Sequence, residues 1–124
     1  MMYSLAVAIG GAFGAVSRYW LITLVSNLSA HRFPWGTFVV NVLGSFLIGV
    51  MYILISERML LSEHWRAIMI VGYLGAFTTF STFSLDALIL MQEGFIVQAF
   101  AYILASVVLC LACAWLGIAL MRVL

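Results

Sequence analysis

Long apolar stretches, separated by a few charged residues, make up most of this chain. Residues 33–56, 67–85 and 94–121 carry no charged side chain, and residues 2–17 form a fourth such stretch whose apolar pattern continues to about residue 25. A helix needs about 20 mostly apolar residues to cross a bilayer. The stretches are continuous rather than alternating, which disfavours a membrane barrel. We therefore predict four membrane-spanning helices, at residues 2–26, 34–56, 66–91 and 96–121.

Composition supports the same picture. Of the 124 residues, 67% are hydrophobic and 7% are charged, and the mean hydropathy is +1.26. A soluble domain carries about a quarter charged residues, and a net charge of +1 provides no basic surface for nucleic acid. The apolar N-terminus lacks the basic region of a signal peptide. We expect an all-α integral membrane protein with a single four-helix domain over residues 1–124. It lies among lipids as a multi-pass protein of the cell inner (plasma) membrane, with no nucleic-acid partner.

The arginines orient the chain weakly. Arg58, Arg66 and Arg122 fall on one side of the membrane, whereas Arg32 falls on the other, joined by Arg18 if that residue is assigned to its nearer helix end. In one interpretation the chain inserts both ways, and two opposed copies form an antiparallel dimer, as inverted repeats do within one transporter. In the other, Arg18 is intramembrane and the topology is fixed. Four thin helices enclose little space, which favours a pathway along a subunit interface.

Small residues follow one face of the first predicted helix. Ala6, Gly10, Gly14 and Arg18 are spaced four apart, and the G-x-x-x-G pattern lets two helices pack closely. We interpret the glycines as a packing face. Arg18 either extends to the interface or faces a cavity, where it would attract anions into a vestibule.

Polar residues recur at the same spacing in the second and fourth predicted helices. Asn41 lies near the middle of its helix, in line with Thr37, Ser45 and Gly49. It forms either an interhelical hydrogen bond or, with the residues in line, the wall of a path. In the fourth helix, Tyr102, Ser106 and Cys110 could complete a polar wall.

The third predicted helix has the most unusual sequence. Residues 78–84 consist of five hydroxyl residues and two phenylalanines, and they follow Gly75 near the bilayer midplane. β-branched and glycine residues weaken a helix. A break at this depth would leave carbonyls facing protein, water or an ion, and two antiparallel copies would present four oxygens to one hard cation. A kinked helix whose hydroxyls bond to their own backbone is the alternative.

Other candidate chemistry is sparse. Phe77, Phe80 and Phe83 recur every third residue, and their electropositive ring edges suit an anion. Cys110 and Cys113 form a C-x-x-C motif, but inside an apolar span, where we expect small buried residues. His31 and His64 fall in loops, where we expect solvation. The sequence contains no nucleophile–base constellation and no phosphate loop, so we expect no enzyme.

Taken together, these segments resemble the fluoride-specific ion channels of the Fluc (CrcB-like) family over nearly the whole chain. The resemblance rests on Gly10-Gly11-Ala12-Phe13-Gly14-Ala15 with Arg18-Tyr19, on Gly36-Thr37, Val40-Asn41 and Gly44-Ser45-Phe46, and on the specific block from Gly75 to Ser84. It implies a break in helix 3 and an antiparallel dual-topology homodimer with two fluoride pathways. It also implies a structural Na⁺ at the dimer centre, held by backbone carbonyls of Gly75 and Thr78. Asn41, Phe80 and Phe83 would contact fluoride, Arg18 would lie in the vestibule, and a polar track would comprise Ser81, Thr82, Tyr102, Ser106 and Thr37.

The implied function is passive, selective export of cytoplasmic fluoride. Stepwise replacement of the water shell by hydroxyl and amide donors would permit conduction. The main alternative is a small proton-coupled multidrug exporter, which needs a membrane-embedded carboxylate; Asp86 is the only candidate in this sequence. A third reading is a non-conducting membrane subunit whose polar stripes are packing faces.

Overall fold

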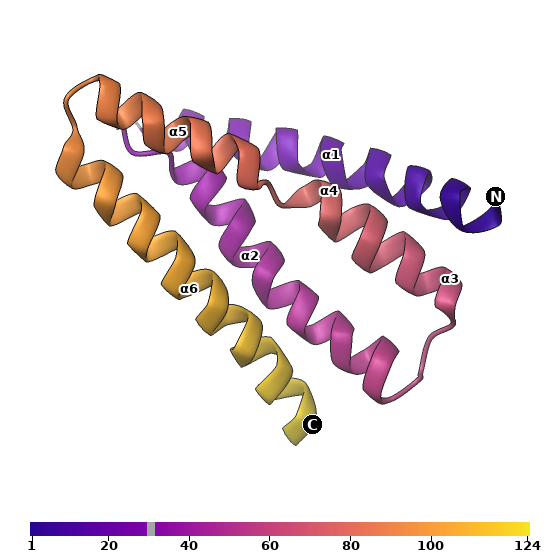
Figure 1. The fold of residues 1–124 in the computed structure, drawn as a ribbon. Coiled ribbons are helices and arrows are strands. Elements are labelled where there is room, and N and C mark those ends of the chain that lie inside the picture. Colours follow the sequence, from indigo (N-terminus) through magenta and orange to yellow (C-terminus); the bar gives the residue numbers. More distant parts are fainter. Residues whose placement is uncertain (30–31) are drawn as a thin grey trace.

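In the part of the chain that the structure describes, four long helices form a bundle, and one of them is divided. This computed structural model describes residues 1–29 and 32–124. Figure 1 shows the helices at residues 35–57 and 96–123 running side by side, and the helix at residues 2–28 crossing them at an angle. Four apolar helical segments are long enough to cross a membrane: Met2–Leu28, Trp35–Glu57, Glu63–Gln92 and Ile96–Val123. The protein is thus all-helical over its described residues. The prediction of a four-span, multi-pass membrane protein is confirmed.

The elements are α1 (Met2–Leu28), α2 (Trp35–Tyr52), π-helical η1 (Ile53–Glu57), α3 (Glu63–Arg66), π-helical η2 (Ala67–Leu74), α4 (Gly75–Phe77), α5 (Phe80–Gln92) and α6 (Ile96–Val123).

Several helix boundaries follow local signals. Pro34 precedes α2. Ser62 has an extended backbone and precedes α3, so the third span begins three residues before the predicted position 66. Gly94 adopts a φ of +87° in the turn between α5 and α6, a conformation that favours glycine.

The bundle contains two closely packed helix pairs, and in both of them glycines lie at the contact. A Cβ at Gly10 or Gly14 of α1 would lie 2.1 Å from a backbone carbonyl oxygen of η2, that of Ile68 or Tyr73. On the second pair, a Cβ at Gly49 of α2 would lie 2.2 Å from the Ala114 carbonyl oxygen of α6. Because only glycine permits such approach, the predicted packing face of α1 is confirmed.

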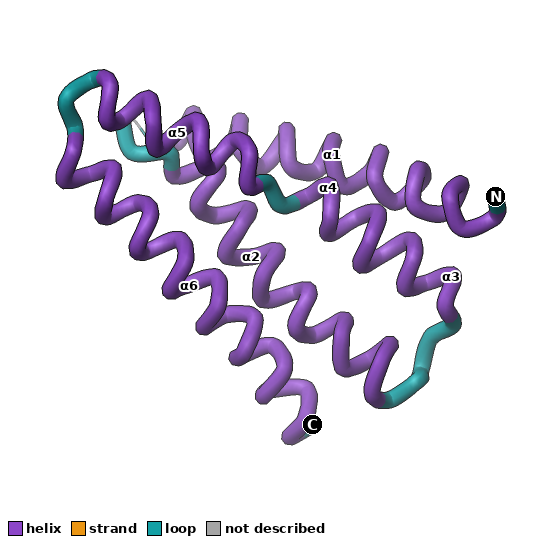
Figure 2. The backbone as a smooth tube through the Cα atoms, in the orientation of Figure 1, coloured by secondary structure: helices purple, strands orange, loops and turns teal. Residues whose placement is uncertain are grey.

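Thr78 and Thr79 separate α4 from α5. Thr78 has φ −85° and ψ 160°, and Thr79 has φ −151° and ψ 120°, so both are extended rather than helical. Figure 2 shows this linker as the loop in the middle of the third span. It lets α5 leave α1 and pack on α6.

Ion pairs join the helix ends. Arg122 on α6 pairs with Glu57 at the end of η1, and Arg32 pairs with Glu93 across the other end of the bundle.

The two histidines were both predicted to lie in loops. His31 lies outside the described residues. The prediction that His64 lies in a loop is wrong, because this residue belongs to α3. It is half-buried, with its ring centroid 4.9 Å from that of Tyr3, so it is also less solvated than predicted.

Candidate functional site

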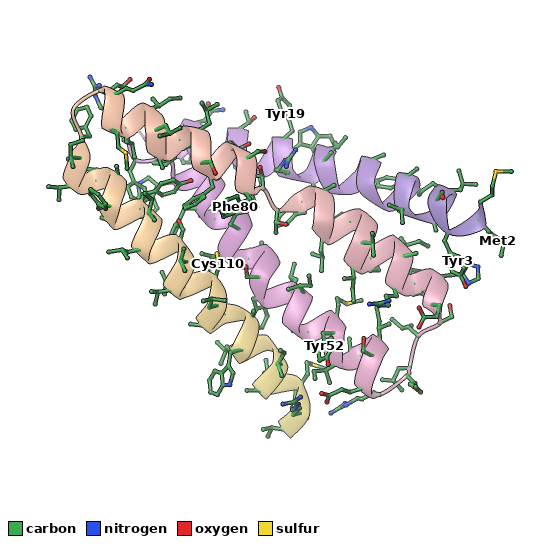
Figure 3. All side chains as sticks on the ribbon, in the orientation of Figure 1. Met2, Tyr3, Tyr19, Tyr52, Phe80 and Cys110 are labelled. Carbon is green, nitrogen blue, oxygen red and sulfur yellow. The ribbon has the colours of Figure 1, made fainter. Side chains whose placement is uncertain are left out.

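A groove lies at the middle of the bundle, where α5 begins. Its volume is about 290 Å³. It is open on one side, since Phe80, which forms part of its wall, is 77% exposed. Figure 3 labels Phe80 and Cys110, which reach this groove from α5 and α6. Besides these two, the lining comprises Asn41, Gly44, Ser45, Ile48, Leu74, Thr78, Thr79, Phe83, Ser106 and Val107.

The Asn41 side chain holds the linker through two hydrogen bonds. Its Nδ2 donates to the carbonyl oxygen of Thr79 at 2.9 Å, and its Oδ1 accepts from the backbone N–H of the same residue at 2.8 Å. An amide has two N–H donors and one oxygen, so one N–H remains for another acceptor. Asn41 also lines the groove. Asn41 therefore hydrogen-bonds across to the third span and also lies in the groove wall; its role in a path stays a prediction.

The Asn41 bonds also affect the carbonyls before the linker. In a continuous helix the Thr79 N–H would donate to the carbonyl of Gly75, four residues earlier, but here it donates to Asn41. Gly75 is exposed and lies outside the groove lining. The Thr78 carbonyl accepts from Arg18 Nη1 at 3.2 Å. Arg18 therefore reaches the linker instead of extending to the membrane surface.

Hydroxyl groups stabilise both ends of the linker. The Thr79 hydroxyl accepts from the backbone N–H of Thr82 at 3.1 Å and caps α5, and it lies 3.4 Å from the Ser81 hydroxyl. The hydroxyls of Thr78 and Ser84 donate to carbonyls four residues earlier, Leu74 and Phe80. The backbone-bonded hydroxyls expected of a kinked helix are thus present beside the extended residues. Ser81 and Thr82 lie next to the groove but do not line it.

Ser106 lines the groove, but its hydroxyl oxygen is buried. The residue is 5% exposed, and its Oγ has no hydrogen-bond partner among the described residues. An unpartnered buried hydroxyl costs about 1–3 kcal/mol, so Ser106 is a costly residue at this position. Cys110, one turn further along α6, lines the same groove.

Tyr102 and Thr37 lie deeper, beyond Phe83, and do not line the groove. Tyr102 is fully buried, and its hydroxyl donates to Asp86 Oδ2 at 3.3 Å. The Thr37 hydroxyl lies beside these two side chains. The Tyr102 ring centroid is 5.1 Å from that of Phe83, so Phe83 separates this polar cluster from the groove.

The structure thus brings together only some of the predicted positions. Asn41, Phe80, Phe83, Ser106 and Thr78 meet at the groove, whereas Gly49, which the spacing placed in the polar stripe of α2, packs on α6. Sequence reasoning assigned no role to Thr79, whose backbone hydrogen-bonds to the Asn41 side chain and whose hydroxyl caps α5. Its only signal was its place among the seven residues 78–84, where the spacing of hydroxyls does not reveal which one begins the helix.

Comparison with known proteins places the chain in a family. Residues 5–118 match the family model described as CrcB-like protein, Camphor Resistance (CrcB). The chain is similar to proteins named "Fluoride-specific ion channel FluC" from three bacteria. Identity is 53% with that of Hahella chejuensis, over 94% of this chain and 91% of the relative. It is 48% with that of Magnetococcus marinus, over 94% of each chain.

The third relative, from Rhizobium etli, is 46% identical over 100% of this chain and 99% of its own length. The match therefore includes the groove, the linker and every predicted site residue. With four spans, an amide that holds an interrupted third helix, and this similarity over its whole length, the chain belongs to the CrcB-like family of membrane proteins.

Proposed function

We propose that the protein is a fluoride-selective channel that lets cytoplasmic fluoride leave the cell passively through the inner membrane. The observation that carries the proposal is the groove itself. At mid-span it combines an unpartnered, buried Ser106 hydroxyl, one remaining Asn41 N–H and two phenylalanine rings. The relatives bear the name of fluoride-specific channels, which supports fluoride as the ion.

The chemistry of the groove suits a small, strongly hydrated anion. Amide and hydroxyl donors replace water molecules one at a time, strongly enough for entry and weakly enough for exit. The Phe80 and Phe83 rings, whose centroids are 5.4 Å apart, offer electropositive edges to an anion. Larger halides fit a narrow path between such rings poorly. Beyond Phe83, the Tyr102 and Thr37 hydroxyls continue the polar track, with Ser81 and Thr82 beside the groove entrance.

A second copy in the opposite orientation would complete each pathway. In one chain the groove is open, Phe80 is 77% exposed and Gly75 is exposed, although all three lie at mid-span. A polar groove open to lipid is unfavourable, so a protein partner over this side is expected. The arginines bias the orientation only weakly, because three of them fall on one side of the membrane and Arg32, with Arg18 if it is counted, on the other. Two antiparallel copies would form two pathways.

The same dimer would provide carbonyl oxygens for a structural sodium ion. Gly75 fits this role, because the Thr79 N–H donates to Asn41 instead of to the Gly75 carbonyl, and because Gly75 is exposed. Thr78 fits only if Arg18 releases its carbonyl, since a guanidinium on the same oxygen repels a cation. Carbonyl oxygen is a suitable ligand for hard cations. A sodium ion held by Gly75 and Thr78 of both copies would lower the cost of an anion near the bilayer midplane.

The test is fluoride efflux from liposomes that contain the purified protein, measured with a fluoride electrode and repeated with chloride. We expect fast fluoride efflux, negligible chloride efflux, and loss of fluoride efflux in Phe80→Ile. Phe100→Ile is the matched control, because Phe100 is exposed on α6 and outside the groove lining. Absence of flux for both anions, in protein shown to be dimeric, would refute the channel and direct attention to proton-coupled transport through Asp86.

A further inference from the structure

A second cavity lies at the far end of α5, separate from the groove. Its volume is about 260 Å³. Its lining along α5 begins at Asp86, three residues after Phe83 of the groove, and ends at Glu93. Glu93 lies 13 residues after Phe80, about 20 Å along a helix at 1.5 Å per residue, so the cavity extends from about one turn beyond the groove lining towards the membrane surface. It is lined by Arg32, Pro34, Asp86, Ile89, Leu90 and Glu93.

Asp86 connects this cavity with the groove. Its carboxylate accepts from Tyr102, the Tyr102 ring contacts Phe83, and Phe83 lines the groove. Asp86, Tyr102 and Phe83 thus form a chain of side-chain contacts from one cavity lining to the other.

Arg32 supplies the positive charge in this lining, against two carboxylates. Its Nη1 donates to Glu93 Oε2 at 3.2 Å, and its guanidinium carbon lies 4.8 Å from the centroid of the Phe95 ring. The side chains of Arg32 and Glu93 are 67% and 46% exposed. Exposed pairs of this kind stabilise a protein little, so an anion can replace Glu93 as the partner of Arg32 at small cost.

We propose that this second cavity is an anion-binding vestibule at the outer end of the pathway, in which Arg32 binds the anion and Glu93 competes for Arg32. The inference rests on the proposed function, because it assigns the vestibule to the fluoride pathway. Arg32 offsets the repulsion that Asp86 and Glu93 exert on an entering anion. Glu93 occupies the guanidinium when no anion is bound. Entry at this mouth therefore depends on the balance of three charges.

The test compares two charge-neutralising variants, Arg32→Gln and Glu93→Gln, in the liposome efflux assay over a range of fluoride concentrations. One unit charge about 5 Å away in water-like surroundings changes local anion affinity about fourfold. We expect the half-saturating fluoride concentration to rise about fourfold in Arg32→Gln and to fall about fourfold in Glu93→Gln. Arg32→Lys, which keeps the charge, should stay close to wild type. Salt at about 1 M should remove these differences, because the Debye length is then about 3 Å.

The other end of the bundle provides matched controls. Arg66 and Glu63 form an exposed ion pair of the same composition, at 3.9 Å, outside both cavities. Arg66→Gln and Glu63→Gln should leave the half-saturating concentration unchanged. If Arg32→Gln and Glu93→Gln behave like these controls while the wild type conducts fluoride, the vestibule is refuted and the channel stands.

Direct binding provides a test that does not need conduction. In protein with ¹³C-labelled arginine guanidinium groups, the Arg32 resonance is identified by its loss in Arg32→Gln. Titration with sodium fluoride should move this resonance in a saturable way, and at a lower concentration in Glu93→Gln. A resonance that does not move, or moves alike in wild type and Glu93→Gln, would overturn the vestibule even in a protein without flux.

Discussion

The contact between α1 and η2 allows a sharp test, because two adjacent glycines on α1 differ in what surrounds them. A Cβ added at Gly10 would lie 2.1 Å from the Ile68 carbonyl oxygen and 3.0 Å from the Tyr73 nitrogen. Both atoms belong to the backbone, so they cannot rotate away and the two helices must separate. At Gly11 the nearest atom, the Gly72 carbonyl oxygen, is 3.9 Å away, which is ordinary contact. Gly10→Ala and Gly11→Ala are therefore a matched pair.

The expected magnitudes follow from two opposing effects. Overpacking a close contact costs about 1–3 kcal/mol, and the rigid backbone partner places Gly10→Ala at the upper end. Alanine recovers about 1 kcal/mol of helix propensity at either position. We therefore expect Gly10→Ala to lower the free energy of unfolding by about 2 kcal/mol. Gly11→Ala should leave it unchanged or raise it by up to about 1 kcal/mol.

The assay is reversible unfolding in mixed micelles with increasing sodium dodecyl sulfate, followed by tryptophan fluorescence. Wild type and both variants are compared at the same protein concentration, because any dimer makes stability depend on concentration. Equal stability of the two variants would refute the argument that α1 and η2 touch through their backbones at Gly10. A large loss in Gly11→Ala alone would show that α1 packs through its other face.

Three further predictions concern the groove and its neighbours. Asn41→Leu removes both hydrogen bonds to the Thr79 backbone, each of which contributes about 1 kcal/mol, so we expect fluoride efflux to fall about tenfold or more. Unchanged efflux would show that the linker does not need this amide. Ser106→Ala removes a buried hydroxyl without a partner, so the free energy of unfolding in micelles should stay equal or rise by up to about 2 kcal/mol, while fluoride efflux decreases. A loss of both stability and efflux would mean that the hydroxyl is structural. Asp86→Asn should retain fluoride efflux in the electrode assay, because a channel needs no carboxylate that exchanges protons, and complete loss of transport would favour the exporter.

Sequence reasoning predicted the four spans because hydropathy acts locally. Each apolar stretch must form a helix to satisfy its own backbone in lipid, so its length and composition are enough to locate it. The packing role of the glycines of α1 was also predictable, since G-x-x-x-G spacing creates a flat face that packs against another helix. Which helix it meets, η2, came only from the structure.

The four-residue spacing of polar positions did not predict their contacts where one face of a helix packs against more than one neighbouring helix. Thr37, Asn41, Ser45 and Gly49 share a spacing, yet Thr37 lies beside Asp86, Asn41 and Ser45 line the groove, and Gly49 packs on α6. A helix with 3.6 residues per turn drifts around its axis over three turns, and its neighbours cross it at an angle. A stripe of four residues four apart thus points to different partners along its length.

By itself, the sequence determined the class of protein, the number of spans, the glycine packing face and the set of polar residues available inside the membrane. Only the tertiary structure decided which of those polar residues meet. The pairing of Asn41 with Thr79 joins residues 38 apart in the chain, and that of Arg18 with Thr78 joins residues 60 apart. Such contacts depend on how the helices cross, because a buried polar group accepts whichever partner the packing brings within hydrogen-bond distance.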